Sequence, residues 1–346
     1  LSSGMVPRDW KKANVIPIFK KGVRSLPGNY RPVSLTFVVG KLFKGFLRDH
    51  IQNYVLENDI ISSNQHGFMK DRSCQTNLIA FYDEVSKKLD TKGHFSILIL
   101  LDLSAAFDHS LLMQILHSIG IRSQAASWIS SYLSNRSFTV SYANKTSSPV
   151  PLNVGVPQGS VLGQLLFSLY TLSLGDLIRS FGFKYHLYAD DTQIYFSTPS
   201  LTVETETQIS NCLLAISNWM NLRHLKLNLT KTELMIFPPK PGPIPPISIS
   251  IDGTLINPVD LARCLGVIFD SCLSFSDHIN TTVKTCHFFL RNIAKICPFL
   301  STATARLLMH ALILSRLDYC NLLLIGLPNS HLSPLQSILN TAARIL

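Results

Sequence analysis

The run Tyr188-Ala189-Asp190-Asp191 decides the fold, because it places two neighbouring carboxylates between two segments with the pattern of β-strands. Residues 184–187 and 192–196 are rich in aromatic and β-branched residues and show no helical period, which is typical of strands. Small and acidic residues between two strands favour a tight turn, so we predict a β-hairpin with both aspartates at its tip. Adjacent carboxylates repel each other and need water or cations around them. The tip is therefore either a solvated turn or part of a divalent metal site.

A metal site needs a further carboxylate, and Asp102 is the best candidate. Residues 95–103 form an apolar run in which Asp102 is the one charged residue, and such runs are typical of strands covered on both faces. An aspartate in such a run is rarely buried without a partner. Together with Asp190 and Asp191 it would supply the hard oxygen ligands that Mg²⁺ prefers, and paired Mg²⁺ ions clamp the attacking and leaving oxygens in phosphoryl transfer.

The charge of the chain is unevenly distributed. Its 346 residues carry a formal net charge of +10, and 46% of them are hydrophobic, enough for a large core and more than one domain. Residues 1–48 have a net charge of +9, residues 278–346 of +5, and the residues between them of −4. Two basic ends around an acidic centre favour a protein that grips a polyanion and holds metal ions, although an ordinary solvated surface is the alternative.

The cysteines and the uncharged segments argue against several classes of protein. The 7 cysteines form no C-x-x-C pair and are odd in number, which disfavours a disulfide framework or a zinc site and favours a reducing compartment. No signal peptide opens the chain, and prolines and glycines interrupt the uncharged span 146–175, which disfavours a membrane helix. Because the chain starts at Leu1 and stops at Leu346 within a helical pattern, we expect a piece of a longer polyprotein, truncated at its C-terminal end.

Helical and strand patterns are mixed along the chain, which predicts an α+β fold. Helices are expected at 36–57, 75–91, 123–133 and 160–175. A further helix follows the Asp102 strand and ends at Gly120. A proline-rich loop at 238–246 and a turn at Asp252-Gly253 separate later strands. Residues 275–346 are predicted to be helical, with one apolar face formed by Leu307, Leu308, Ala311 and Leu314.

Seven short blocks of sequence stand in a fixed order along the chain. They are NYRPVSL at 29–35, QHGF at 65–68 with Arg72-Ser73, LDLSAAFD at 101–108, GVPQGSVLG at 155–163, YADD at 188–191, KTE at 231–233 and LGVIFD at 265–270. In this order the blocks resemble the reverse transcriptase domain of LINE-type (non-LTR) retrotransposons. The resemblance implies a right-hand polymerase fold with an antiparallel-sheet palm. Its expected parts are fingers at 1–94 and 120–152, palm at 95–119 and 153–274, and a helical thumb at 275–346.

The resemblance implies catalytic roles for three carboxylates and one lysine. Asp102, Asp190 and Asp191 match the family's ligands of two catalytic Mg²⁺ ions, which Mn²⁺ can replace. Of the hairpin pair, Asp190 is expected to bind both ions. Lys231 matches the family's general acid for the leaving pyrophosphate, although a lysine at the end of a strand could equally have no such role.

Five further residues match positions that contact the nucleotide or the primer. Phe107 matches the steric gate whose ring excludes a 2′-hydroxyl; the alternative is a core aromatic residue. Gln158 and Gly159 match the nucleotide-facing turn; the alternative is an ordinary helix N-terminus. Arg72 matches the residue that contacts the triphosphate; the alternative is a surface salt bridge. Gly266 lies in a segment similar to the primer grip, where the backbone approaches nucleic acid.

We therefore expect an RNA-directed DNA polymerase that adds dNMP units to a primer 3′-hydroxyl under the direction of a template. The expected partners are an RNA template, a DNA primer or nicked target DNA, and dNTPs, with no membrane and no disulfide-linked partner. The expected location is intracellular, in the nucleus and the cytoplasm. The alternatives are a nucleic-acid-binding remnant without catalysis and a reverse transcriptase of the intron maturase type.

Several departures from the family's pattern are typical of a decayed copy. Gln164 stands where a proline is usual, and Cys74 where a threonine is usual. Residues that the family carries between the positions of Asp108 and His109 are missing, and a loss of about three residues rotates a following helix by about 300° at about 3.6 residues per turn. We therefore expect a chain that folds but is weak or inactive as an enzyme.

Overall fold

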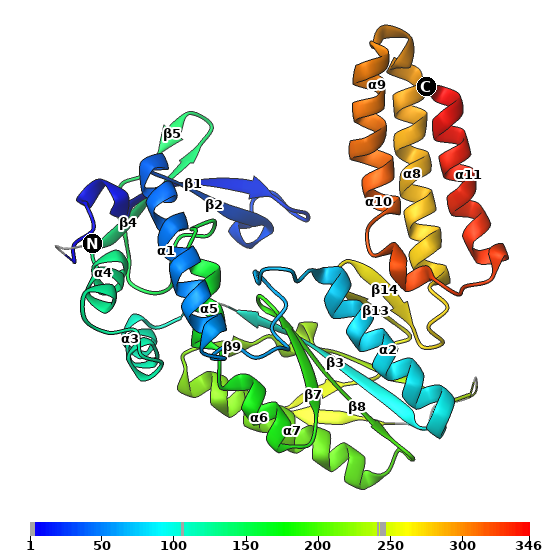
Figure 1. Cartoon of the computed structure of the whole chain (residues 1–346), viewed down its shortest axis with the longest axis horizontal. Helices are drawn as coiled ribbons and strands as arrows, with labels where there is room; N and C mark the ends of the chain where they lie inside the picture. Colours follow the sequence, from blue (N-terminus) through cyan, green and yellow to red (C-terminus); the bar gives the residue numbers. More distant parts are fainter. Residues whose placement is uncertain (1–3, 105–106, 241, 243–246) are drawn as a thin grey trace. The chain divides into compact units, whose positions relative to one another are not determined.

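The computed structural model (Figure 1) describes residues 4–104, 107–240, 242 and 247–346. It divides into two compact units. The first unit consists of the residues up to Phe68, Asp102–Phe181 and Cys212–Asn228, and the second of Met69–Leu101, Gly182–Asn211 and Leu229–Leu346. The chain passes from one unit to the other within strand β3 (Phe95–Ser104) and within helix α7 (Val203–Leu222). Each unit is therefore assembled from separate stretches of sequence.

A β-sheet lies at the centre of the first unit. It consists of β1 (Lys12–Phe19), β2 (Tyr30–Thr36), β4 (Arg136–Tyr142), β5 (Lys145–Thr146) and β6 (Val150–Leu152). β1 lies between β2 and β4, antiparallel to the first and parallel to the second. Ala13 and Val15 of β1 are buried, whereas Ile16 and Ile18 are exposed. This alternation is that of a strand with one covered face.

Helices complete the first unit. They are α1 (Val38–Glu57), α3 (His109–Ser118), α4 (Ser123–Leu133), α5 (Gly163–Tyr170) and α6 (Leu174–Ser180), with 3₁₀ turns at Arg8–Lys11 and Pro27–Asn29. The predicted helices at 36–57 and 123–133 and the helix before Gly120 are confirmed. α3 begins where the Asp108 carboxylate accepts a hydrogen bond from Leu111 N (2.9 Å), which satisfies one of the free N–H groups of the first turn.

The predicted helix at 160–175 is wrong in its bounds, because it consists of two shorter pieces. Ser160 Oγ accepts a hydrogen bond from Gly163 N (3.1 Å), so a turn precedes the helix and α5 begins only at Gly163. The hydroxyl of Thr171 donates back to the carbonyl of Phe167 (3.1 Å), and such a bond competes with continuation of the helix. Since residues 160–175 include no charged residue, the hydrophobic pattern could not locate either end.

A second β-sheet forms the centre of the second unit, in the order β10-β3-β8-β7 (Figure 1). Its other strands are β10 (Glu233–Phe237), β8 (Asp191–Thr198) and β7 (Lys184–Tyr188). β3 is antiparallel to β10, and Ile97, Leu98 and Ile99 of β3 are all at most 1% exposed. The predicted strand with two covered faces is thereby confirmed. The last residues of β3 belong to the first unit, where they pair with β9 (Lys226–Leu227).

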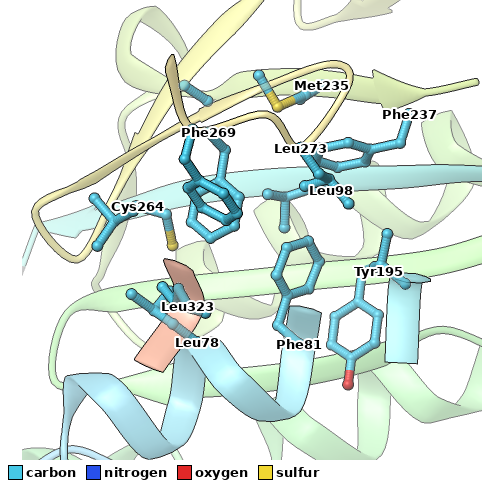
Figure 2. Packing of buried hydrophobic residues seen from close by; sticks show 14 of the residues in the cluster. Leu78, Phe81, Leu98, Tyr195, Met235, Phe237, Cys264, Phe269, Leu273 and Leu323 are labelled. Carbon is cyan, nitrogen blue, oxygen red and sulfur yellow. The ribbon is translucent and has the colours of Figure 1, made fainter. Parts of the chain in front are cut away.

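A hydrophobic core joins helix α2 (Cys74–Lys92) to this sheet (Figure 2). Phe81 of α2 meets the ring of Tyr195 from β8 edge-on, with ring centroids 5.3 Å apart, and that of Phe269 at 5.6 Å. Ser73 caps the start of α2, and Gly93 ends it with a left-handed φ of 59°, which confirms the helix predicted at 75–91. The core fixes α2 against the strands that carry the candidate site.

Two small hairpins follow β10 in the second unit. They are formed by β11 (Ile249–Ile251) with β12 (Thr254–Ile256) and by β13 (Leu261–Cys264) with β14 (Val267–Asp270), and a 3₁₀ turn spans Leu229–Lys231. The predicted turn at Asp252-Gly253 is confirmed, since Ile251 pairs with Thr254 on either side of it. The predicted loop at 238–246 lies partly outside the described residues.

The C-terminal part of the second unit is helical, as predicted. It consists of α8 (Ser276–Ile296), α9 (Thr302–Met309), α10 (Ser315–Leu317) and α11 (Asn329–Ile345), a π-helical turn at His310–Leu314, and 3₁₀ turns at Cys297–Phe299 and Asn321–Leu324. α8, α9 and α11 lie side by side in Figure 1 and share a core. No helix in the described part of the chain has the length and apolar content needed to cross a membrane.

The apolar face predicted for this helical part is only partly right, because Leu308 packs against the core whereas Leu307 and Ala311 are exposed. Leu307 is 68% exposed, whereas Ala305, Met309 and Ile313 are buried at 2% or less. Residues 305–314 are apolar on almost every side, so the choice of face depends on the neighbouring helices α8 and α11 rather than on the local pattern. The π-helical turn also changes the spacing of side chains after Met309.

Candidate active site

The two neighbouring aspartates lie at the tip of a β-hairpin, as predicted. Tyr188 of β7 pairs with Asp191 of β8, so that Ala189 and Asp190 form a two-residue turn between them. Asp190 and Asp191 are both exposed. Ala189 has a φ of 58°, a left-handed conformation that costs an alanine about 1–2 kcal/mol. The hairpin thus presents two carboxylates to solvent on a turn whose backbone conformation is unfavourable in isolation.

Side-chain contacts with α2 hold this hairpin in place. The Tyr195 hydroxyl donates to Glu84 of α2 (2.9 Å), and Lys184 forms an ion pair with the same carboxylate. Burial raises the pKa of Tyr195 to about 12, so this hydroxyl remains a donor at neutral pH. A hydrogen bond with the Cys74 thiol, together with burial, raises the pKa of Tyr188 to about 12. Both strands of the hairpin are therefore tied to α2 by side-chain contacts.

Asp102, the predicted third carboxylate, is half-buried near the end of β3. Its backbone carbonyl accepts a hydrogen bond from Asn228 N (3.2 Å), and the next residue, Leu103, pairs with Leu227 of β9. Asp102 belongs to the first unit, whereas Asp190 and Asp191 belong to the second. Within the described ranges no cluster of three or more His, Cys, Asp or Glu residues is suited to a metal ion. The joint metal site therefore stays a prediction.

Phe107 is buried, with 3% of its surface exposed, in a loop that leads into α3. Its ring packs against Tyr170 of α5, with ring centroids 5.7 Å apart. The loop is bonded to the turn predicted to face the nucleotide, because Gly155 N donates to the Phe107 carbonyl (2.9 Å) and His109 Nε2 lies 2.7 Å from the Gly155 carbonyl. Both interpretations of Phe107 remain open. The role of His109 was missed because its partner lies 46 residues further along the chain.

Gln158 and Gly159 lie at an exposed turn before α5. Ser160 N donates to the Pro157 carbonyl (3.0 Å), and Gly159 has a φ of 91°, so the turn fits a type II geometry that requires glycine at this position. The Gln158 carbonyl accepts a hydrogen bond from Ser34 N of β2 (3.0 Å). The backbone of Gln158 is thereby fixed while its side chain stays accessible.

Arg72 and Lys231, predicted to contact the triphosphate and to transfer a proton, lie in the second unit. Arg72 is half-buried just before the N-cap of α2, and Lys231 is exposed in the 3₁₀ turn that precedes β10. Their contact with a triphosphate and their proton transfer stay predictions.

Gly266 lies in the two-residue turn between β13 and β14. Leu265 and Gly266 have φ values of 45° and 88°, as expected for a tight hairpin turn that favours glycine. A Cβ atom on Gly266 would lie 3.2 Å from the ring of Tyr319. The Tyr319 hydroxyl donates to the Leu265 carbonyl (2.5 Å). The observed close approach to this glycine is that of a tyrosine ring, a contact that the local sequence gave no means of predicting.

Comparison with known proteins places these features in a family. Residues 18–288 match the family model described as reverse transcriptase (RNA-dependent DNA polymerase). Relatives from Drosophila melanogaster include the probable RNA-directed DNA polymerase from transposon BS, 26% identical over 87% of this chain and 34% of that protein. The RNA-directed DNA polymerase from mobile element jockey is 27% identical over 81% of this chain and 31% of that protein. The chain thus spans about a third of the length of the curated relatives it matches.

A solved structure shares the fold. The apo telomerase from Candida tropicalis, truncated from its C-terminal domain, superposes with a TM-score of 0.50 and 11% sequence identity over 77% of this chain and 56% of that chain. The expected α+β right-hand polymerase fold and the expected LINE-type affiliation are confirmed. With a family match over most of its length, this chain belongs to the reverse transcriptase (RNA-dependent DNA polymerase) family.

Proposed function

We propose that this chain is the polymerase part of a LINE-type reverse transcriptase, and that it copies an RNA template by adding dNMP units to a primer 3′-hydroxyl. The observation that carries the proposal is the hairpin that exposes Asp190 and Asp191 at its tip, in a chain that matches the family over residues 18–288. The proposed partners are the RNA template, a DNA primer or nicked target DNA, and dNTPs, at an intracellular location in nucleus and cytoplasm. The fingers, palm and thumb ranges expected from the sequence are proposed on the same basis.

Asp102 is proposed as the third carboxylate of the site. β3 lies beside β8 in the sheet of the second unit, and Asp102 directly follows Leu101 in that strand. Ser96, near the start of β3, shares a hydrogen bond of 2.8 Å with Ser197, near the end of β8. β3 and β8 are therefore neighbours within the second unit, to which β3 belongs as far as Leu101. The proposal that Asp102 completes the site rests on its place in the LDLSAAFD block, in a chain that matches the family over residues 18–288.

The donor set fits a pair of hard divalent cations, because it consists of carboxylate oxygens. Asp102, Asp190 and Asp191 would hold two Mg²⁺ ions, or Mn²⁺ in their place, and the ions supply charge stabilisation for phosphoryl transfer.

The remaining roles fall to other side chains. Arg72 binds the triphosphate through its paired N–H donors. Gln158 and Gly159 orient the incoming nucleotide, and the ring of Phe107 excludes a 2′-hydroxyl. Lys231 gives a proton to the leaving pyrophosphate, and Gly266 lets the backbone approach the primer.

Primer extension on a homopolymeric RNA template, with oligo(dT), dTTP and Mg²⁺, tests this proposal. Asp190→Asn and Asp102→Asn keep the side-chain shape but remove the charge, so each should lower kcat by about 10³-fold or more. Their losses should not add, because the residues act as one unit. The matched control is Asp176→Asn on α6. Asp176 forms an exposed ion pair with Arg179, and such pairs contribute only about 0–1 kcal/mol to stability.

The outcomes separate the proposal from its alternatives. Asp176→Asn should extend primers like the parent. If Asp190→Asn or Asp102→Asn also did so, the metal-site assignment would fail. A parent chain that binds the primer–template but incorporates no dTMP would instead support the alternative of a binding remnant without catalysis.

A further inference from the structure

A chain of polar contacts in the second unit connects the turn that carries Gly266 to the hairpin that carries Asp190 and Asp191. At one end, the Tyr319 hydroxyl donates to the Leu265 carbonyl (2.5 Å), and its ring lies against Gly266. Cys74 at the start of α2 packs against the hydrophobic core that contains Cys264, Tyr195 and Cys320, the neighbour of Tyr319. Burial and hydrogen bonding with the Cys74 thiol raise the pKa of Tyr319, and hydrogen bonding with the same thiol, followed by burial, raises the pKa of Tyr188. Tyr188 pairs with Asp191. Residues from four separate stretches of sequence therefore meet in one contact chain.

The surrounding core restricts these groups. Cys320, next to Tyr319, is 4% exposed and belongs to the same hydrophobic cluster as Cys264, which directly precedes the Leu265-Gly266 turn. Burial raises the pKa of the Cys320 thiol to about 11, and burial and the contacts with Cys74 and Cys320 raise the pKa of Tyr319 well above its usual value. The hydroxyl of Tyr319 thus stays protonated and able to donate over the whole physiological range.

Tyr319 itself is 41% exposed and lies between α10 and the 3₁₀ turn at Asn321–Leu324. Its hydroxyl reaches a carbonyl 54 residues earlier in the chain. The hydroxyl is used to fix the position of one peptide group, that of Leu265, next to the glycine proposed to approach the primer.

We propose that Tyr319 is a positioning residue for the primer terminus, which sets the Leu265-Gly266 turn relative to the Asp190-Asp191 hairpin through the Cys74 thiol. This inference rests on the proposed function, because only a polymerase would give the aligned turn a primer to hold. Catalysis is sensitive to such alignment, since a displacement of about 1 Å can lower the rate about 10²-fold. Tyr319 need not touch the nucleotide, so its loss should affect use of the primer and leave use of the dNTP unchanged.

Tyr319→Phe tests the inference, because it removes the hydroxyl and keeps the ring. We expect KM for the primer–template to rise roughly three- to tenfold, the factor that corresponds to the loss of one hydrogen bond, with KM for dTTP unchanged. The control is Tyr82→Phe, which removes a hydroxyl beside the same core, where Tyr82 packs against Phe275. Cys74→Ala should raise KM for the primer–template in the same way, and Cys74→Ser should bring KM back toward the parental value. In the double variant Tyr319→Phe/Cys74→Ala, the loss in binding free energy should be smaller than the sum of the two single losses.

A binding measurement keeps the inference testable apart from catalysis. Fluorescence anisotropy with a labelled recessed primer–template and with the RNA strand alone should show weaker binding of Tyr319→Phe to the first and unchanged binding to the second. If the parent extends primers and Tyr319→Phe matches Tyr82→Phe in both assays, the positioning role fails and the proposed function stands. If the parent binds but does not extend, the proposed function fails, and selective weakening in Tyr319→Phe still supports the positioning role. Equal changes in KM for primer and dTTP would show a merely structural contribution and overturn the inference.

Discussion

At the scale of single residues, Ala189 shows how the hairpin is kept in a conformation that its sequence does not favour. A left-handed φ of 58° is unfavourable for a residue with a Cβ atom, and such backbone strain persists only where the surroundings over-determine it. Here the surroundings are the paired strands on either side and the contacts of Tyr188 and Tyr195 with α2. The position of Asp190 is therefore set by the strand pairing and by the contacts of these two tyrosines with α2.

Phe107 permits a prediction at the same scale. Phe107→Val removes the ring that would exclude a 2′-hydroxyl, so the ratio of kcat/KM for dNTP to that for rNTP should fall, by about tenfold or more if the ring opposes the hydroxyl with about 1.4 kcal/mol. The ring is also buried against Tyr170, so the variant will lose stability as well. Phe167→Val in α5 is the matched control, since Phe167 is a buried phenylalanine of the same unit.

The two variants should be compared at equal folded concentration, determined by urea unfolding. A reduced ratio in Phe107→Val with a parental ratio in Phe167→Val supports the gate. An unchanged ratio in both would leave Phe107 with the role of a core aromatic residue.

At the scale of the elements, local patterns predicted what local interactions decide. The hairpin at 188–191 and α4 follow from strand and helix periods and from turn residues within a few positions. The exposed Leu307 was wrongly predicted to lie on the apolar face, and the helix predicted at 160–175 is interrupted at Thr171, because a neighbouring helix decides the first feature and a side-chain hydroxyl the second. In the candidate site, the carboxylates were visible in the sequence. The contact of Tyr319 with Leu265 was not, because it joins residues 54 positions apart.

The connection between Phe107 and α3 allows a test of whether this copy is damaged. The family pattern has about three more residues between Asp108 and His109, and their loss would turn a helix by about 300°. α3 nevertheless begins directly after Asp108 and buries Leu112 and Leu116 completely. Burial of such side chains is worth about 1.5–3 kcal/mol each, so helix packing should dominate and any strain should fall on the loop that holds Phe107.

Insertion of Thr-Val-Asp after Asp108 should therefore raise primer extension, by up to about 10²-fold if the loop is displaced by about 1 Å. The inserted aspartate would directly precede His109 and could cap α3 in place of Asp108. The same three residues inserted after Asn144, in the exposed turn between β4 and β5, provide the control. Equal activity of the parent and the Asp108 insertion would contradict the interpretation of a damaged copy.

At the scale of the whole molecule, nearly all of the net charge lies in one unit. The first unit has 16 Lys and Arg against 7 Asp and Glu, a net charge of +9, and the second has 15 against 14, a net charge of +1. Of the two basic ends of the chain, only the N-terminal one therefore belongs to a strongly basic unit. The basic C-terminal helices belong to the second unit, where acidic residues offset their charge. A polyanion should be attracted chiefly to the first unit.

The unequal net charge of the two units predicts which substitutions weaken binding of a primer–template. Lys20, Lys21 and Arg31 lie on or beside β1 and β2 and are exposed. Lys44 is unsuitable, since it is 1% exposed over the ring of Tyr132 and burial, with nearby Arg136 and Lys41, lowers its pKa to about 8. Deletion of the first 28 residues is also unsuitable, because it would remove β1 from between β2 and β4.

The triple variant Lys20→Gln/Lys21→Gln/Arg31→Gln should therefore flatten the plot of log K against log salt by about 2–3, since each phosphate contact contributes about 0.7–0.9 to the slope. The matched control changes the same charge at the exposed Lys70, Lys87 and Lys240 of the second unit, and should change the slope little. Equal flattening by both variants would show that only total charge matters. A parent whose binding barely responds to salt would contradict the polyanion interpretation itself, because counterion release from a nucleic acid cannot be avoided when cationic side chains bind its phosphates.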